Sequence, residues 1–186
     1  MNINEIKKIA RSIAHNRQFR KVTSSFNCGF TSIDYIREYY NINARIIDFK
    51  TIEGEDWKDC EAATYYNEKT KQFNICIQSG LIQARKRYAL AVQLGHIFLK
   101  HISIDDKEAL SLFKKETMYN ENKVNNIKLK EAIIFAKELL MPEEYFLDEA
   151  NRGICTFIDT LADTFLVSKV AARNRCLELN ITKFYE

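Results

Sequence analysis

The sequence predicts an α+β fold in which a small antiparallel sheet or hairpin packs on a mostly helical body. The chain of 186 residues contains one Pro and five Gly, so few residues interrupt a helix. Apolar residues recur at helical spacing in several long segments. One central stretch is instead rich in β-forming residues, which predicts a sheet between the helical segments.

The N-terminal quarter predicts two helices and a strand. Apolar side chains spaced by three and four over residues 3–15 predict a short amphipathic helix. The segment 23–30 is expected to be a connection, after which Thr31 or Ser32 can cap a second helix. The run 44–49 is then expected to form a strand.

A hairpin is predicted over residues 61–80, followed by a long helix. "AATYY" and "FNICI" are rich in β-formers, the polar stretch "NEKTKQ" separates them, and Gly80 ends the hairpin. Residues 81–101 show helical spacing. The next segment, 103–130, is expected to begin with a short capped helix and to continue as a polar surface loop.

Two helical segments complete the chain. Residues 130–140 predict a helix that stops at Met141-Pro142, because proline cannot continue it. Residues 157–180 predict helical structure with one turn inside.

Composition limits the class of protein. Hydrophobic residues make up 46% of the chain, with 12 Phe and 9 Tyr, which is enough for a buried core. No apolar run reaches the roughly 18 residues of a membrane span, and the N-terminus lacks the apolar region of a signal peptide. The five cysteines form no C-x-x-C pair, which favours reduced thiols in the cytoplasm over cysteine-bound zinc.

Charge is distributed unevenly along the chain. Residues 1–26 contain six Lys or Arg against Glu5, whereas the whole chain has a net charge of only +3. We therefore divide the chain into a basic helical N-terminal arm, 1–26, and a single globular domain, 27–186. The arm could contact an acidic partner or nucleic acid, or it could simply be a solvated helix face.

The stretch Val92-Gln93-Leu94-Gly95-His96 has the spacing of an H-E-x-x-H zinc-binding helix, but Val and Gln stand where the motif has its first His and its Glu. In such a helix two histidines one turn apart bind Zn²⁺, and the glutamate takes a proton from the metal-bound water. Val92 has no ligand atom, and the Gln93 amide accepts no proton near neutral pH.

Three ordered motifs resemble the ImmA/IrrE-type metallopeptidase family. "RYALAVQLGHIFLKH" (87–101) is similar to the family's F-T-L-A-H-E-L-G-H-x-x-L-x-H stretch, and "EAIIFAKELLMP" (131–142) to its E-A-N-x-F-A-x-x-L-L-M-P motif. "LADTFLVSKVAARNRCLELN" (161–180) is similar to its L-A-x-x-F-x-V-S tail. The resemblance spans roughly residues 30–183.

The resemblance implies a zincin-like fold with a His, His, Glu zinc site. The first His falls on Val92 and the catalytic Glu on Gln93, so both are lost, as is the Asn of the second motif, at Ile133. The second His is kept as His96 and the third ligand as Glu131. We therefore expect no catalytic residue and no cofactor. His96 and Glu131 would form a remnant metal site, and zinc binding at these two residues is the alternative.

Two contacts around the remnant site are left open by the sequence. His101 lies about 140° around an ideal helix from His96, so it faces elsewhere unless the helix ends before it. If no metal binds, His96 and Glu131 can hydrogen bond across the former site.

The resemblance also implies a regulatory role. Family members often accompany helix-turn-helix repressors in phages and mobile elements, and they relieve repression by cleaving or engaging the repressor. We predict a catalytically inactive relative, a pseudoenzyme that acts as an anti-repressor by binding a regulatory protein in the cytoplasm, with such a repressor as the expected partner. One alternative is an active metal-dependent endopeptidase with an altered ligand set.

A second alternative is a DNA-binding regulator. Residues 161–180 also resemble a helix-turn-helix that would offer Lys169, Arg173 and Arg175 to DNA. The charge of the chain outside the arm is −2, which offers little attraction for phosphate, so nucleic acid is not the favoured partner. No membrane partner is expected.

Overall fold

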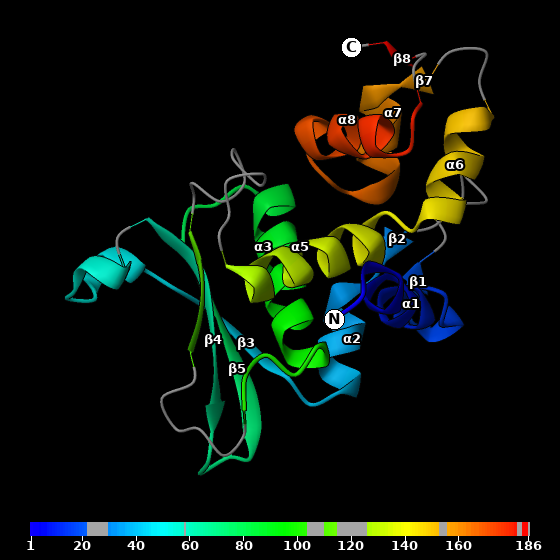
Figure 1. The fold of residues 1–186 in the computed structure, drawn as a ribbon. Coiled ribbons are helices and arrows are strands. Elements are labelled where there is room, and N and C mark those ends of the chain that lie inside the picture. The colour runs from blue at the N-terminus through cyan, green and yellow to red at the C-terminus, as the bar shows by residue number, and fades with distance from the viewer. Residues whose placement is uncertain are drawn as a thin grey trace.

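The computed structural model has a four-stranded sheet with helices covering one face (Figure 1). It describes residues 1–21, 30–57, 59–103, 110–114, 126–152, 156–181 and 184–185. The α+β class predicted from the sequence is confirmed. None of the described helices combines the length and the apolar character that a membrane span requires.

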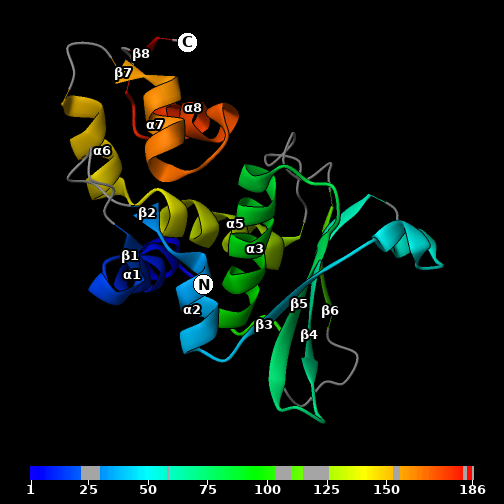
Figure 2. The same cartoon turned by 180° about the vertical axis from the view of Figure 1, so that it is seen from behind.

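The predicted hairpin forms the centre of the sheet. Strands β4 (Cys60–Asn67) and β5 (Gln72–Gln78) pair antiparallel, and β3 (Asn43–Ile47) joins the outer side of β5 in parallel. The fourth strand, β6 (Leu110–Lys114), pairs antiparallel with β4 and completes the order β3-β5-β4-β6 (Figure 2).

Strand β6 is an element that the sequence analysis missed. Its five residues are too few to show a clear period, and their pairing with β4 is a contact between distant parts of the chain. The segment 103–130 was predicted to be a short helix followed by a polar loop, but it contains this strand, and its residues 127–130 already belong to the helix that runs to Leu140. The rest of that prediction falls on 104–109 and 115–125, outside the described residues, as does most of the predicted connection 23–30.

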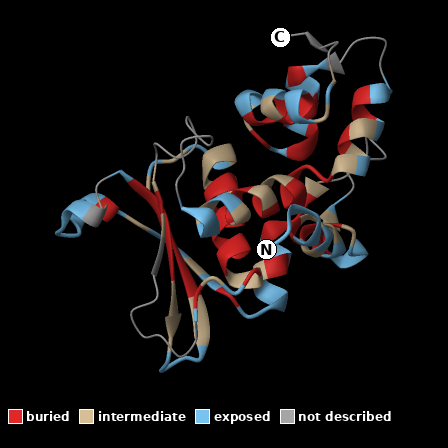
Figure 3. Ribbon diagram, in the orientation of Figure 1, coloured by how far each residue is buried: buried red, intermediate tan, exposed pale blue. Residues whose placement is uncertain are grey.

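Two helices pack against each other across the face of the sheet. Helix α3 (Gln83–Phe98) lies on the sheet, and α5 (Ile127–Leu140) packs on α3, where buried residues concentrate (Figure 3). The two backbones come close at Gly95, where a Cβ would lie 2.9 Å from the carbonyl oxygen of Ala132. A glycine is therefore required by the distance between the helices, not by its backbone angles.

The N-terminal helix belongs to the same core. Helix α1 (Ile3–Ala14) packs on α5 through Ile6, Ala10, Ile13 and Ala14, none of which is more than 6% exposed. Helix α2 (Ile33–Tyr39) follows Ser32, which occupies the expected cap position without a side-chain capping bond.

The C-terminal segment forms the predicted pair of helices, α7 (Ile158–Phe165) and α8 (Lys169–Glu178). Leu166 turns the chain with a φ of 51°, and the Ser168 side chain caps α8 by accepting from the amide of Ala171. Helix α6 (Glu143–Asn151), which was not predicted, begins directly after Pro142.

Short elements complete the fold. They are the strand pairs β1 (Arg20–Lys21) with β2 (Phe30–Thr31) and β7 (Thr156–Phe157) with β8 (Phe184–Tyr185), and the 3₁₀ turns η1 (Arg17–Phe19), η2 (Phe49–Thr51) and η3 (Glu55–Trp57).

A buried ion cluster joins the helices to one another. The carboxylate of Glu138, on α5, is fully buried and accepts from Arg175 Nη2 at 2.6 Å, from Arg11 Nε at 2.7 Å and from the amide of Glu143 at 3.0 Å. Burial raises the pKa of Glu138, but the charge of Arg175 and these hydrogen bonds outweigh burial and lower it. The cluster thus connects α1, α5, α6 and α8 through one carboxylate.

Candidate remnant metal site

The site predicted from the sequence lies where α3 faces α5. Val92 and His96 are one turn apart, so they share the face of α3 that Gly95 brings close to α5. Glu131 lies in the first turns of α5, next to Ala132, which contacts Gly95. The fold therefore brings His96 and Glu131 to the same region, as the resemblance implied.

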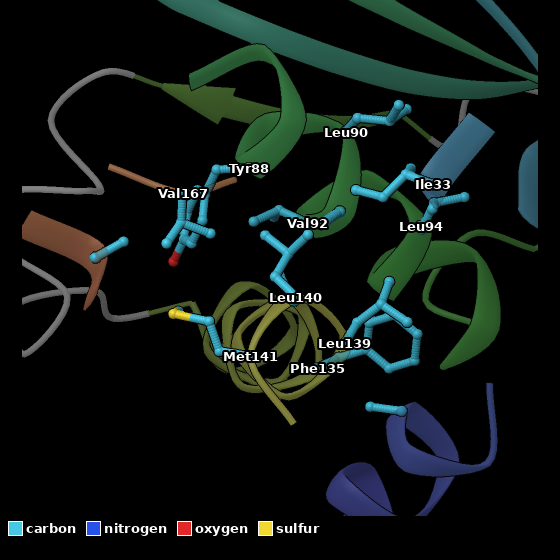
Figure 4. Close-up of a cluster of buried hydrophobic side chains, with 14 of the residues drawn as sticks. Ile33, Tyr88, Leu90, Val92, Leu94, Phe135, Leu139, Leu140, Met141 and Val167 are labelled. Carbon is cyan, nitrogen blue, oxygen red and sulfur yellow. The ribbon is translucent and has the colours of Figure 1, made fainter. Parts of the chain in front are cut away.

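Val92 occupies the position of the lost first ligand as a core residue. Its side chain is completely buried and points toward Leu140 of α5 (Figure 4). An isopropyl group has no lone pair to offer a metal, so this position contributes packing only.

Gln93 replaces the catalytic glutamate and makes a structural contact. Its side chain is completely buried, and Nε2 donates to the carbonyl oxygen of Ala62 at 3.3 Å. This bond links α3 to β4, and an ionised carboxylate could not make it because it has no donor. The Oε1 atom of Gln93 is buried without a hydrogen-bond partner.

A chain of side chains runs from His96 through His101 to Glu131. The Nδ1 atoms of the two histidines are 3.2 Å apart, and His101 Nε2 is 2.8 Å from Glu131 Oε2. Helix α3 ends at Phe98, and Lys100, with a φ of 56°, turns the chain back so that the amide of His101 donates to the carbonyl of His96 at 2.8 Å.

Helix α3 therefore ends before His101, which allows the His101 side chain to face the site. The His96–Glu131 hydrogen bond considered from the sequence is replaced by a bridge, with His101 between the two residues. The sequence left the position of His101 open because a lysine at position 100 does not indicate a left-handed turn.

The hydrogen-bond roles follow from Glu131. Its pKa is lowered by hydrogen bonds from the terminal ammonium of Met1 and from His101, so the carboxylate is an acceptor. Neutral His101 then donates from Nε2 and accepts at Nδ1 from the N–H of His96. This tautomer, assigned from the network, leaves the lone pair of His96 on Nε2, which is buried without a partner.

Both histidines are held in the neutral form. The pKa of His96 is lowered to about 3, mainly by burial and to a smaller extent by the neighbouring His101 and Lys128. Burial also lowers the pKa of His101, although Glu131 opposes that shift. Neutral imidazole is the form that ligates metals.

The zinc set of three protein ligands does not fit this chain. Val92 removes one ligand, and the two remaining family positions are joined by hydrogen bonds through His101. Among the described residues, no group of three or more His, Cys, Asp and Glu side chains is arranged to hold a metal ion. The assignment of His96 and Glu131 as metal ligands therefore stays a prediction.

Of the basic residues considered for DNA contact, one lies inside the molecule. Arg175 is 3% exposed and is bound to Glu138. It therefore cannot reach a phosphate without breaking the buried cluster. Lys169 and Arg173 remain on the exposed face of α8.

The four-stranded sheet with α3 and α5 on one face has the α+β architecture of a zincin-like domain. A family model described as the IrrE N-terminal-like domain of peptidase M78 matches residues 37–177. The chain belongs to this family, and the resemblance stated from the three motifs is confirmed.

Among solved structures, the chain is similar to a Mycobacterium tuberculosis transcriptional regulator. The two share 15% sequence identity with a TM-score of 0.50, over 92% of this chain and 46% of the regulator. The chain thus spans less than half of that protein, and the likeness supports the fold alone. A comparison with curated proteins finds no match.

Proposed function

We propose that this chain is a catalytically inactive member of its family that acts by binding a regulatory protein. The observation that carries the proposal is the environment of Val92 and Gln93. Both side chains are completely buried, one in the apolar core and one on the carbonyl of Ala62. The positions of a ligand and a base are used for stability, which leaves binding as the role.

The expected partner is a helix-turn-helix repressor, and the proposed role is that of an anti-repressor encoded by a phage or mobile element. This partner is proposed because members of the family often accompany such repressors. The role requires a cytoplasmic location, where repressors bind DNA. Exposed apolar side chains on α8, Val170 at 58% and Leu177 at 59%, supply a surface for such a protein.

A release assay tests this proposal. A candidate repressor is bound to labelled operator DNA, the chain is added, and fluorescence anisotropy follows release while mass spectrometry follows the repressor. We expect release with the repressor intact, unchanged in the His96→Ala variant and weakened in Val170→Glu. Ile127→Glu is the matched control, since Ile127 is 72% exposed on α5. Repressor fragments that disappear in His96→Ala would reject the proposal.

One observation favours the alternative, a metal-dependent endopeptidase with an altered ligand set. His101 brings a second imidazole nitrogen to 3.2 Å from that of His96, with Glu131 beyond it. Elemental mass spectrometry of the purified chain, with His96→Ala and His101→Ala as controls, tests it. About one zinc per chain, lost in both variants, would support this alternative. Zinc well below that level would reject it.

A further inference from the structure

A pocket of about 670 Å³ lies on the side of α3 opposite the remnant site. From α3 it is lined by Lys86, Arg87 and Leu90, together with residues of α2, β3 and the turn after α7. Leu90 lies about 200° around the helix from Val92. Accordingly, Figure 4 shows Leu90 beside Ile33, away from α5, whereas Val92 points toward Leu140. The pocket and the remnant site are separate.

Apolar side chains from two parallel strands form part of the pocket lining. They are Ala44 and Ile46 of β3 and Ile77 of β5, and the two strands are parallel neighbours. Ile46 is 61% exposed, so an apolar side chain is left uncovered in the pocket lining.

Cations outnumber carboxylates in the lining of the pocket, with Lys21, Arg37, Arg45, Lys86 and Arg87 against Asp34 and Asp163. Lys21, Lys86 and Arg87 line the pocket, and none of them forms an ion pair with a described residue. Two acidic residues, Asp34 and Asp163, also line it, but Asp34 is bonded to Arg37 at 3.1 Å.

Arg87 shows most clearly that a counter-ion is missing. Its Nη2 donates to the carbonyl of Thr31 at 2.6 Å, while its Nε is buried with no hydrogen-bond partner. Burial lowers the pKa of Arg87 to about 10, because a guanidinium is poorly solvated there, although Asp34 opposes that shift. A buried guanidinium without a counter-ion is costly, and an anion in the pocket would place an opposite charge close to it.

We propose that this pocket binds a small amphiphilic organic anion, such as an aliphatic carboxylate or phosphate ester. The anionic group lies against Lys86 and Arg87, and the apolar part lies on Ile46, Ile77 and Leu90. The volume is that of an ordinary small-molecule site. Because Leu166 and Val167 also line the pocket, the ligand contacts the α7–α8 turn as well as the sheet.

The test uses the fluorescent anion 8-anilinonaphthalene-1-sulfonate with the full chain. We expect one saturable site per chain, from which octanoate displaces the dye and the neutral octanol does not. Two variants place a charge in the pocket, Lys86→Glu and Ile46→Glu. Their controls are Lys8→Glu and Ile82→Glu, two exposed positions that do not line the pocket.

The affinity should fall about tenfold or more in the two pocket variants and stay within about twofold in the controls. Lys86→Glu removes a charge-assisted contact, and Ile46→Glu places a negative charge against the apolar part of the ligand. Absence of saturable binding, equal losses in the controls, or displacement by octanol would overturn the proposal. Tighter binding of an acidic peptide such as a glutamate decamer would also overturn it and indicate a protein-binding groove. Repressor release is measured separately, so this proposal and the proposed function fail independently.

Discussion

At the scale of single residues, the two substitutions in the former catalytic motif are integrated into the interior. Val92 fills the space between α3 and α5, and Gln93 donates to a strand carbonyl. Replacing Val92 by His or Gln93 by Glu, the family residues, is therefore expected to lower the stability of the fold.

We expect Gln93→Glu to destabilise the fold by about 2–4 kcal/mol, because a buried carboxylate would face the carbonyl of Ala62 without a donor. Urea unfolding measures this, with Gln83→Glu on the exposed start of α3 as the control. No peptide hydrolysis should appear, because Val92 still supplies no ligand. Hydrolysis by the single variant would contradict a purely structural role of Val92.

Gly95→Ala tests the close approach of the helices. The added methyl group would lie 2.9 Å from the oxygen and 3.0 Å from the Cα of Ala132, both backbone atoms that cannot rotate away. We expect a loss of about 1–3 kcal/mol in the free energy of unfolding, as for other overpacked cores. A change below about 0.5 kcal/mol would show that α3 and α5 can separate freely.

At the scale of the elements, the buried carboxylate of Glu138 holds four helices together. Glu138→Gln would remove the buried carboxylate 2.6 Å from Arg175 and leave that guanidinium with only the partly exposed Glu178, 3.4 Å away, so we expect a loss of about 3–5 kcal/mol. Thermal and urea unfolding measure it, and Glu144→Gln, whose side chain is 69% exposed, should have little effect.

The same carboxylate predicts a pH dependence. Its pKa is lower in the folded chain than the ordinary 4.5, so between these values the unfolded chain binds more protons. Its contribution to stability is present above pH 4.5 and is lost as the pH falls through the folded-state pKa. Urea midpoints measured from pH 7 downward should fall more steeply for the native chain than for Glu138→Gln, and parallel curves would contradict this.

At the scale of the whole molecule, the basic N-terminal segment is joined to the body by both apolar and charged contacts. Four apolar residues of α1 are buried, and Arg11 bonds to Glu138 and to Glu143. Part of the positive charge in residues 1–26 is therefore used inside the molecule.

Whether residues 1–26 form a separable arm stays a prediction that a deletion can test. Removing residues 1–15 would expose the apolar face of α5 and leave Glu138 with one guanidinium fewer. We expect loss of the single cooperative transition in calorimetry. A fragment that still unfolds cooperatively, at a temperature near that of the full chain, would show that the arm is independent.

What the sequence by itself determined is local or chemical. The spacing of apolar residues predicts α1, α3 and α5, and the β-forming runs predict the hairpin. Both patterns are local, because each is contained in a short segment of the sequence. The loss of a ligand and a base at positions 92 and 93 is also readable, because donor atoms belong to the residue type.

The tertiary structure decided which residues meet. His101 joins His96 and Glu131 only because the chain reverses at Lys100, and β6 exists only through its pairing with β4. Arg175, which in the sequence looks available to DNA, is buried on Glu138, 37 residues away. Such contacts depend on long-range packing, which no local pattern of residues encodes.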